Sequence, residues 1–197
     1  MPVFASQAEL ETFAEKFVGE RLGALEKDAR HALAAPYAPF PAILLTFSTI
    51  DLLGALAFGD ASKRAPTSQQ SADYMQQFMN YTAGQAKLLQ DLFRHKLVHL
   101  AQPTAVASFQ GKFVSWHYWH DDASHHLKLV TLPAPRTLAV ASGLTLTVEQ
   151  EFEVSIGHLV NDVGDSARRP GGYLPRLKTD VTLRGNFEKA ISQIYGP

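Results

Sequence analysis

The segment Asp91-Leu92-Phe93-Arg94-His95-Lys96-Leu97-Val98-His99-Leu100 decides the predicted fold, because it sets charged and titratable side chains inside an apolar helical pattern. The apolar residues between Gly84 and Pro103 recur at three- and four-residue spacings, which is typical of an amphipathic helix that packs one stripe into a core. Asp91, His95 and His99 follow one another at four-residue steps, so they form one polar column beside that stripe. We therefore expect candidate chemistry on the polar side of this helix.

The residues before this segment predict further helices. Ser6-Gln7-Ala8-Glu9 matches a capping box, and the apolar spacing after it predicts a first helix to about His31. The stretch Ala42–Phe58 is apolar nearly all round, as expected of a helix at the centre of a bundle, and Gly59 ends it. Ser71 is expected to cap a third helix, which carries tyrosine, phenylalanine and methionine side chains.

After the central segment the spacing changes to alternation, which predicts strands. The residues Val106–Val130 alternate between the two faces of an extended chain. A loop at Asp121–Ser124 lets His125–Val130 return as the second strand of a hairpin, and Leu138–Leu146 is a candidate third strand. We expect a β-hairpin or a small antiparallel sheet here.

The C-terminal part returns to helical spacing. A second capping box, Thr147-Val148-Glu149-Gln150, predicts a helix over about 148–169, and a last helix is expected over about 182–195. These two helices would complete a helical core of about 6–103, with a β-rich insertion at about 106–146. The expected fold is a single, mainly α domain over all 197 residues: a four- or five-helix bundle with the insertion in its C-terminal half.

Two residues of the central segment carry a resemblance to a known family. Arg94 and His99, with four residues between them and the polar His95 directly after the arginine, resemble the R-x4-6-H motif of the HEPN superfamily. The resemblance covers about 42–103. HEPN domains are small helical bundles, and many are metal-independent ribonucleases of toxin–antitoxin, abortive-infection and RNA-processing systems. The resemblance implies a divergent bacterial member of this superfamily that cleaves RNA without a cofactor.

The resemblance assigns the chemistry to three residues. His99 would transfer a proton, because an imidazole with an ordinary pKa of about 6.5 exchanges protons near neutral pH. Arg94 would hold the phosphate oxygens with its two-point fork, and His95 would orient His99 or hold a phosphate. The ribose 2′-OH would attack its own 3′-phosphate and leave a 2′,3′-cyclic phosphate. The alternative is that Arg94 and His99 are solvated residues at the edge of a core helix.

Other polar residues are candidates for supporting roles. Asp51 and Ser48 lie on the preceding apolar helix and would support the site, whereas Asp91 is expected to pair with His95. Basic residues near the motif and in the C-terminal third are candidates for phosphate binding, although a loose cluster of this kind is also typical of a solvated face. The candidates are Lys96, Arg168 and Arg169.

A histidine-rich stretch offers a different interpretation. His120, His125 and Asp122 carry nitrogen and carboxylate donors of the kind that bind Zn²⁺ or Ni²⁺. In a hairpin with a short loop His120 and His125 would face each other across the strands. The competing interpretation is a polar hairpin tip stabilised by aromatic packing, and we expect no metal in the leading function.

Composition limits the classes of function. The 18 Lys and Arg against 19 Asp and Glu give a net charge of −1, so an RNA contact would need a local basic patch. The chain has no cysteine, which excludes disulfides, thiolate catalysis and cysteine-based zinc sites. The first residues lack the basic and apolar regions of a signal peptide, and Ala42–Phe58 is shorter than the ~20 residues of a membrane span. We expect a cytoplasmic protein.

The motif also predicts an oligomeric state. Arg94 and His99 are separated by about 140° around one helix, so one chain cannot easily bring both to a single phosphate. A two-fold homodimer with facing motif helices could bring an arginine and a histidine to the same phosphate. RNA and a neutralising partner protein are the other expected partners, and no membrane is expected. The alternative function is a non-catalytic helical module that binds a nucleotide, RNA or protein, or that dimerises.

Overall fold

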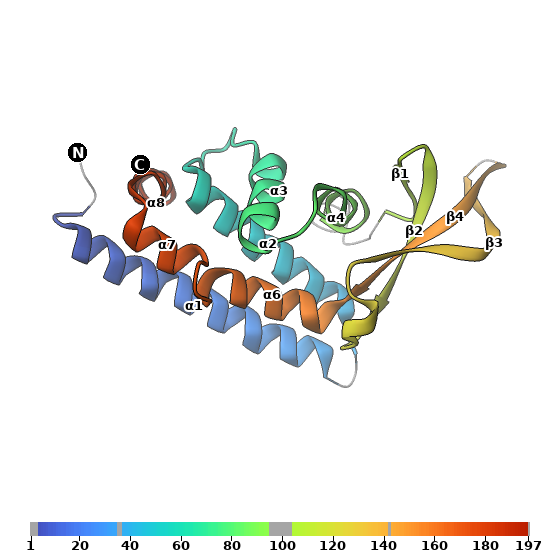
Figure 1. The fold of residues 1–197 in the computed structure, drawn as a ribbon, viewed down its shortest axis with the longest axis horizontal. Helices are drawn as coiled ribbons and strands as arrows, with labels where there is room; N and C mark the ends of the chain where they lie inside the picture. Colours follow the sequence, from blue (N-terminus) through green and yellow to red (C-terminus); the bar gives the residue numbers. More distant parts are fainter. Residues whose placement is uncertain (1–3, 35–36, 95–103, 142, 197) are drawn as a thin grey trace.

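The computed structural model describes residues 4–34, 37–94, 104–141 and 143–196, and it is mainly helical with a small sheet at one end (Figure 1). The helical elements are α1 (Gln7–Leu33), α2 (Pro39–Phe58), α3 (Thr67–Phe78), α4 (Ala83–Leu89), a π-helical turn η1 (Gln90–Arg94), a 3-10 turn η2 (Ala123–His125), α6 (Ile156–Arg168), α7 (Tyr173–Thr179) and α8 (Val181–Tyr195). The strands are β1 (Ala107–Phe109), β2 (Lys112–Trp119), β3 (Lys128–Ala141) and β4 (Leu144–Ser155). The mainly helical prediction is confirmed.

The long helix α1 begins as the sequence predicts. The Ser6 hydroxyl accepts a hydrogen bond from the Glu9 amide at 3.2 Å, and the Glu9 carboxylate accepts one from the Ala5 amide at 2.8 Å. The first bond satisfies a backbone donor that the first helical turn leaves unpaired, and the second ties the residue before the cap to that turn. α1 then runs along one side of the molecule with α6 beside it (Figure 1).

The central helix α2 packs against α1, α3, α6 and α8, as its apolar sequence predicts. Phe47, Ile50 and Leu56 are fully buried, and Gly59 ends the helix in the left-handed conformation with φ of 75°. By length and mean hydropathy (1.7) α2 could cross a membrane, but 56% of its most apolar window is buried inside the molecule. That burial is typical of the core helix of a soluble protein.

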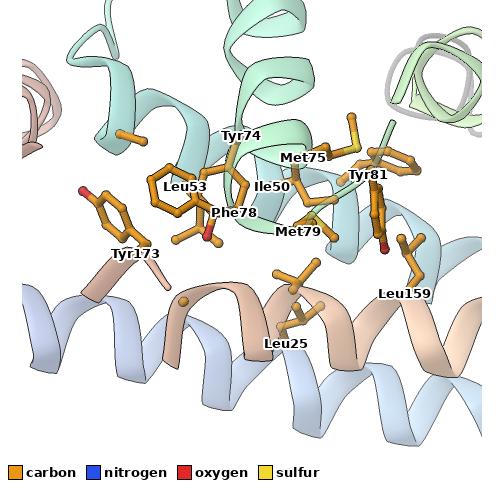
Figure 2. Packing of buried hydrophobic residues seen from close by; sticks show 14 of the residues in the cluster. Leu25, Ile50, Leu53, Tyr74, Met75, Phe78, Met79, Tyr81, Leu159 and Tyr173 are labelled. Carbon is orange, nitrogen blue, oxygen red and sulfur yellow. The ribbon is translucent and has the colours of Figure 1, made fainter. Parts of the chain in front are cut away.

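Aromatic side chains fill the space where α3 faces α6 and α7. Tyr74 and Phe78 of α3 lie against Tyr173, with ring centroids 6.3 and 5.6 Å from it, and all three are buried (Figure 2). Edge-to-face contacts of this kind add to the apolar area that the rings bury. The Tyr74 hydroxyl is satisfied by Ser166 of α6 at 2.9 Å.

The start of α3 corrects one prediction. The helix begins at Thr67, so Ser71 lies one turn inside it and does not cap it. Ser71 bonds instead to the Thr67 carbonyl at 2.8 Å and to Asp51 of α2. The capping prediction is wrong because the hydroxyl has a partner on a neighbouring helix that local sequence does not reveal.

The sheet corrects a second prediction. Its strand order is β1-β2-β4-β3, and β2 pairs with β4 in parallel, with Trp116 opposite Phe152. β2 and β3 therefore do not form the predicted hairpin, and the sheet is mixed and not antiparallel. Among the described residues, β3 lies at the edge of the sheet and pairs with β4 alone. Its residues Pro133 and Pro135 lack an amide donor, which suits an edge strand and disfavours a central one.

The segment after residue 146 corrects a third prediction. Thr147–Gln150 belongs to β4, and helix α6 begins only at Ile156, so the β-rich region extends to Ser155. Val148, Phe152 and Val154 lie two or four residues apart and are buried, the period of a strand. Pairing with strands on both sides outweighs the short capping pattern. The last predicted helix is confirmed as α8, whereas α7 was not predicted.

The contact between α2 and α3 generates a stability prediction. A Cβ atom on Gly54 would lie 2.9 Å from the backbone of Gln70, so Gly54→Ala should push the two helices apart. We expect the free energy of unfolding to fall by about 1–3 kcal/mol, as measured by urea denaturation. Gly23→Ala on α1 is the control, because nothing lies within 4 Å of its Cβ position. That variant should gain up to about 1 kcal/mol from helix propensity, and a loss as large as that of Gly54→Ala would contradict the packing argument.

Candidate functional site

Arg94 ends the π-helical turn that follows α4. Helix α4 is fixed at its start by a capping box, in which the Thr82 hydroxyl accepts from the Gln85 amide at 3.2 Å and Gln85 accepts from the Thr82 amide at 2.9 Å. Leu92 and Phe93 of the turn are buried in the core. π-helical turns are rare and frequently lie at functional sites. Here the turn leaves Arg94 only 7% exposed.

The Arg94 guanidinium is held by two neighbouring helices. Its Nε donates to the two Asp51 carboxylate oxygens at 2.8 and 3.1 Å, and its Nη2 donates to Asp51 Oδ2 at 3.0 Å. Nη1 donates to the Ser68 hydroxyl at 2.8 Å. These contacts engage three of the five guanidinium N–H groups. Within the part of the chain that the structure describes, one N–H on each terminal nitrogen has no partner.

A second ring of contacts supports this ion pair. Asp51 accepts a short hydrogen bond from the Ser71 hydroxyl, and Ser71 is fully buried in α3. The Gln90 side chain donates to the Ser68 carbonyl at 2.8 Å and ties the π-helical turn to the start of α3. Asp51 is predicted from the sequence as a site residue, whereas Ser68, Ser71 and Gln90 are not. The signal available was that Ser71 and Gln90 are polar residues within apolar helical patterns.

The other residues of the predicted site have different outcomes. His95, Lys96 and His99 lie outside the described residues, so their predicted roles stay predictions. Asp91 lies within 2.5 Å of Lys87 one turn earlier on α4, and its expected pairing with His95 stays a prediction. Ser48 is exposed and lines a groove between α1 and α2. In the described part of the chain no hydrogen bond joins Ser48 to Arg94, although Ser48 was expected to support that residue.

The two C-terminal arginines predicted to bind phosphate make contacts within the chain. Arg168 forms an ion pair with Glu26 of α1, and Arg169 donates to the Phe78 carbonyl at 2.7 Å. Both contacts hold α6 against its neighbours. The structure therefore gives these two side chains partners on α1 and α3.

The predicted metal ligands are dispersed. His120 Nε2 lies 2.8 Å from the Leu33 carbonyl, and His125 pairs with Glu153 at 2.8 Å. Asp122 accepts from the Ser124 amide and hydroxyl, and those hydrogen bonds lower the pKa of the Asp122 carboxyl. Among the residues that the structure describes, no three His, Asp or Glu side chains assemble around a metal position.

A second polar cluster joins the sheet to the bundle. The Tyr81 hydroxyl donates to Asp162 of α6 at 2.6 Å, and His126 Nε2 lies 3.1 Å from the same carboxylate oxygen. Burial and the neighbouring Asp162 raise the pKa of Tyr81 well above its ordinary value. Burial by itself raises the pKa of Asp162, but the hydrogen bonds from His126 and Tyr81 outweigh it and lower that pKa. Asp162 is therefore an anion held by two donors from outside its own helix.

Three nearby residues have the types of a hydrolase triad but not its geometry. His158 Nδ1 lies 3.0 Å from the Ser155 hydroxyl and 3.1 Å from the Asp121 carboxylate. A triad needs the serine and the carboxylate on opposite ring nitrogens, whereas here both meet the same one. Ser155 is also fully buried and accepts from the Asp122 amide at 3.0 Å. This arrangement ties the start of α6 to the Asp121–Asp122 segment and does not make a nucleophile.

Comparison of the chain with protein-family models, with curated protein sequences and with solved structures finds no match in any of the three.

The first prediction from this site concerns the ion pair. Asp51→Asn should lower the free energy of unfolding by about 3 kcal/mol or more, because the buried Arg94 charge loses its counter-ion. Asp91→Asn is the control, since its pair with Lys87 is on the surface and should contribute less than about 1 kcal/mol. Denaturant unfolding at pH 7 measures both variants. Equal effects of the two substitutions would contradict the importance assigned to Asp51.

The second prediction concerns pH. Because the folded pKa of Asp162 is lowered, its contribution to stability is present above the unfolded pKa of about 3.9 and is lost as pH falls through the folded value. Thermal unfolding should show a gap between wild type and Asp162→Asn at pH 7 that narrows progressively below about pH 4. Asp165→Asn on the exposed side of α6 is the surface control and should change the melting temperature at pH 7 by less than Asp162→Asn does. A gap that stays constant to pH 2 would refute the lowered pKa.

Proposed function

We propose that the protein is a HEPN-like, metal-independent ribonuclease in which Arg94 and His99 act on the scissile phosphate. The proposal is supported by the hydrogen bonds that orient Arg94. A carboxylate and a hydroxyl bind its guanidinium, and each terminal nitrogen retains one N–H group that has no partner among the described residues. Two such donors match two phosphate oxygens. A guanidinium that is fixed before the substrate binds needs little reorganisation during the reaction.

The proposed reaction divides the work between the two side chains. The ribose 2′-oxygen attacks the adjacent phosphorus while a neutral His99 accepts its proton. The phosphorus passes through a pentacoordinate state, whose additional negative charge Arg94 stabilises. The bond to the 5′-oxygen then breaks, and a second, protonated histidine donates a proton to that oxygen. The products are a 2′,3′-cyclic phosphate and a 5′-hydroxyl.

A two-fold homodimer is part of this proposal. A second copy of the motif would supply the protonated histidine that a single chain lacks, and it would bring each Arg94 near the other chain's His99. Light scattering at micromolar concentration should give about twice the chain mass of 21.6 kDa. A stable monomer that still cleaves RNA would eliminate the composite site.

The decisive experiment is cleavage of mixed RNA in EDTA. Wild type should produce fragments that end in a 2′,3′-cyclic phosphate, and His99→Ala should lower kcat by at least about 100-fold. Arg94→Lys keeps the charge and loses the fork, so it should also lower kcat by about 100-fold or more. His31→Ala is the control, because His31 is an exposed residue near the end of α1. Absence of cleavage, or equal cleavage by wild type and His99→Ala, would reject the proposal.

The second candidate is a non-catalytic helical module, and one observation favours it. Arg94 is 7% exposed and its charge is neutralised by Asp51, as expected of an arginine that ties helices together. In that case Arg94→Lys should lower the melting temperature, and no RNA cleavage should be detected for either protein. The EDTA assay therefore separates the two candidates when it is combined with melting temperatures.

A further inference from the structure

The serines of α3 lie close to the Asp51–Arg94 pair because α2 and α3 are in backbone contact. A Cβ on Gly54 would lie 2.9 Å from the Gln70 carbonyl, so the two helices meet where a side chain is missing. A serine side chain is short, so it reaches an ion pair on another helix only when the backbones approach closely. Ser68 and Ser71 are on the α3 turns that flank this contact.

The two serines act on different parts of the ion pair. Ser68 accepts directly from Arg94 Nη1 at 2.8 Å, on the terminal nitrogen that Asp51 does not engage. Ser71 acts through the carboxylate, since its hydroxyl donates to Asp51 Oδ1, which in turn accepts from Arg94 Nε at 2.8 Å. Together they define both the rotation of the guanidinium and the position of its counter-ion.

We propose that Ser68 and Ser71 are positioning residues that hold Arg94 in the orientation that RNA cleavage needs. The effect of the two serines on catalysis rests on the proposed ribonuclease function. Their effect on the orientation of Arg94 can be measured without substrate. Neither serine touches the substrate in this proposal. Their effect reaches the phosphate only through Arg94, so their loss should affect kcat more than KM.

The substrate-free measurement uses the guanidinium itself. NMR of protein with ¹⁵N-labelled arginine gives an Nε–H signal for Arg94, assigned by its loss in Arg94→Lys. In wild type, exchange of this hydrogen with water should be slow, because the Nε–H is buried and bonded to Asp51. Ser68→Ala and Ser71→Ala should each speed this exchange by about fivefold, the effect of one lost hydrogen bond.

Two variants provide controls. Ser166→Ala removes a buried serine hydroxyl whose hydrogen bonds within the described residues go to Tyr74 and to the Val163 carbonyl, so it should cost stability and leave Arg94 exchange unchanged. Ser68→Thr keeps the hydroxyl on a half-buried side chain and should restore wild-type exchange.

In the RNA assay Ser68→Ala and Ser71→Ala should lower kcat about tenfold with KM changed less than twofold, and Ser68→Thr should recover most of the loss.

The outcomes separate the two proposals. Unchanged exchange in both alanine variants, or the same acceleration in Ser166→Ala, overturns the positioning role. Faster exchange combined with a wild type that does not cleave RNA keeps the positioning role and rejects the ribonuclease. Faster exchange with unchanged kcat rejects the link between the orientation of Arg94 and catalysis.

Discussion

The structure depends on one charge inside an apolar helix. α2 is surrounded by helices, and Asp51 is the only charged residue between Pro39 and Phe58. A carboxylate at that place needs a cationic partner and further hydrogen-bond donors, because its desolvation is otherwise costly. Arg94 and Ser71 supply these, and both come from elements that α2 also packs against. The requirement of this one side chain therefore links α2, α3 and the turn that follows α4.

The sequence predicts the helices better than the sheet, for a physical reason. Helix signals are local, so the Ser6 cap and the apolar stretch of α2 identify α1 and α2 within a few residues of their observed limits. Strand pairing is decided by residues far apart in the chain. The parallel pairing of β2 with β4 joins residues more than 30 positions apart, as with Trp116 and Phe152, and no local spacing encodes it. The capping box at Thr147–Gln150 was a local signal that this pairing overrode.

The candidate site shows the same difference between features that local sequence predicts and contacts that depend on residues far apart in the chain. Asp51 was predicted as a supporting residue on the helix before the motif, and Arg94 was predicted from its spacing to His99, but the ion pair between Asp51 and Arg94 was not predicted. Ser68 and Ser71 were not identified, because their contacts exist only where Gly54 lets α3 approach α2. Ser48 is exposed, and no hydrogen bond among the described residues joins it to Arg94. It precedes Asp51 by less than one helical turn, but it lies in the groove toward α1.

The edge strand β3 has a consequence for how the molecules behave at high concentration. An exposed edge is a template on which another chain can add a strand, and such addition leads to fibres. Pro133 and Pro135 interrupt the row of amide donors along β3, in the region where its pairing with β4 is irregular. At the opposite edge, β1 has only three residues. An incoming strand therefore meets an interrupted row of amide donors at one edge of the sheet and a very short strand at the other, and both features disfavour ordered aggregation.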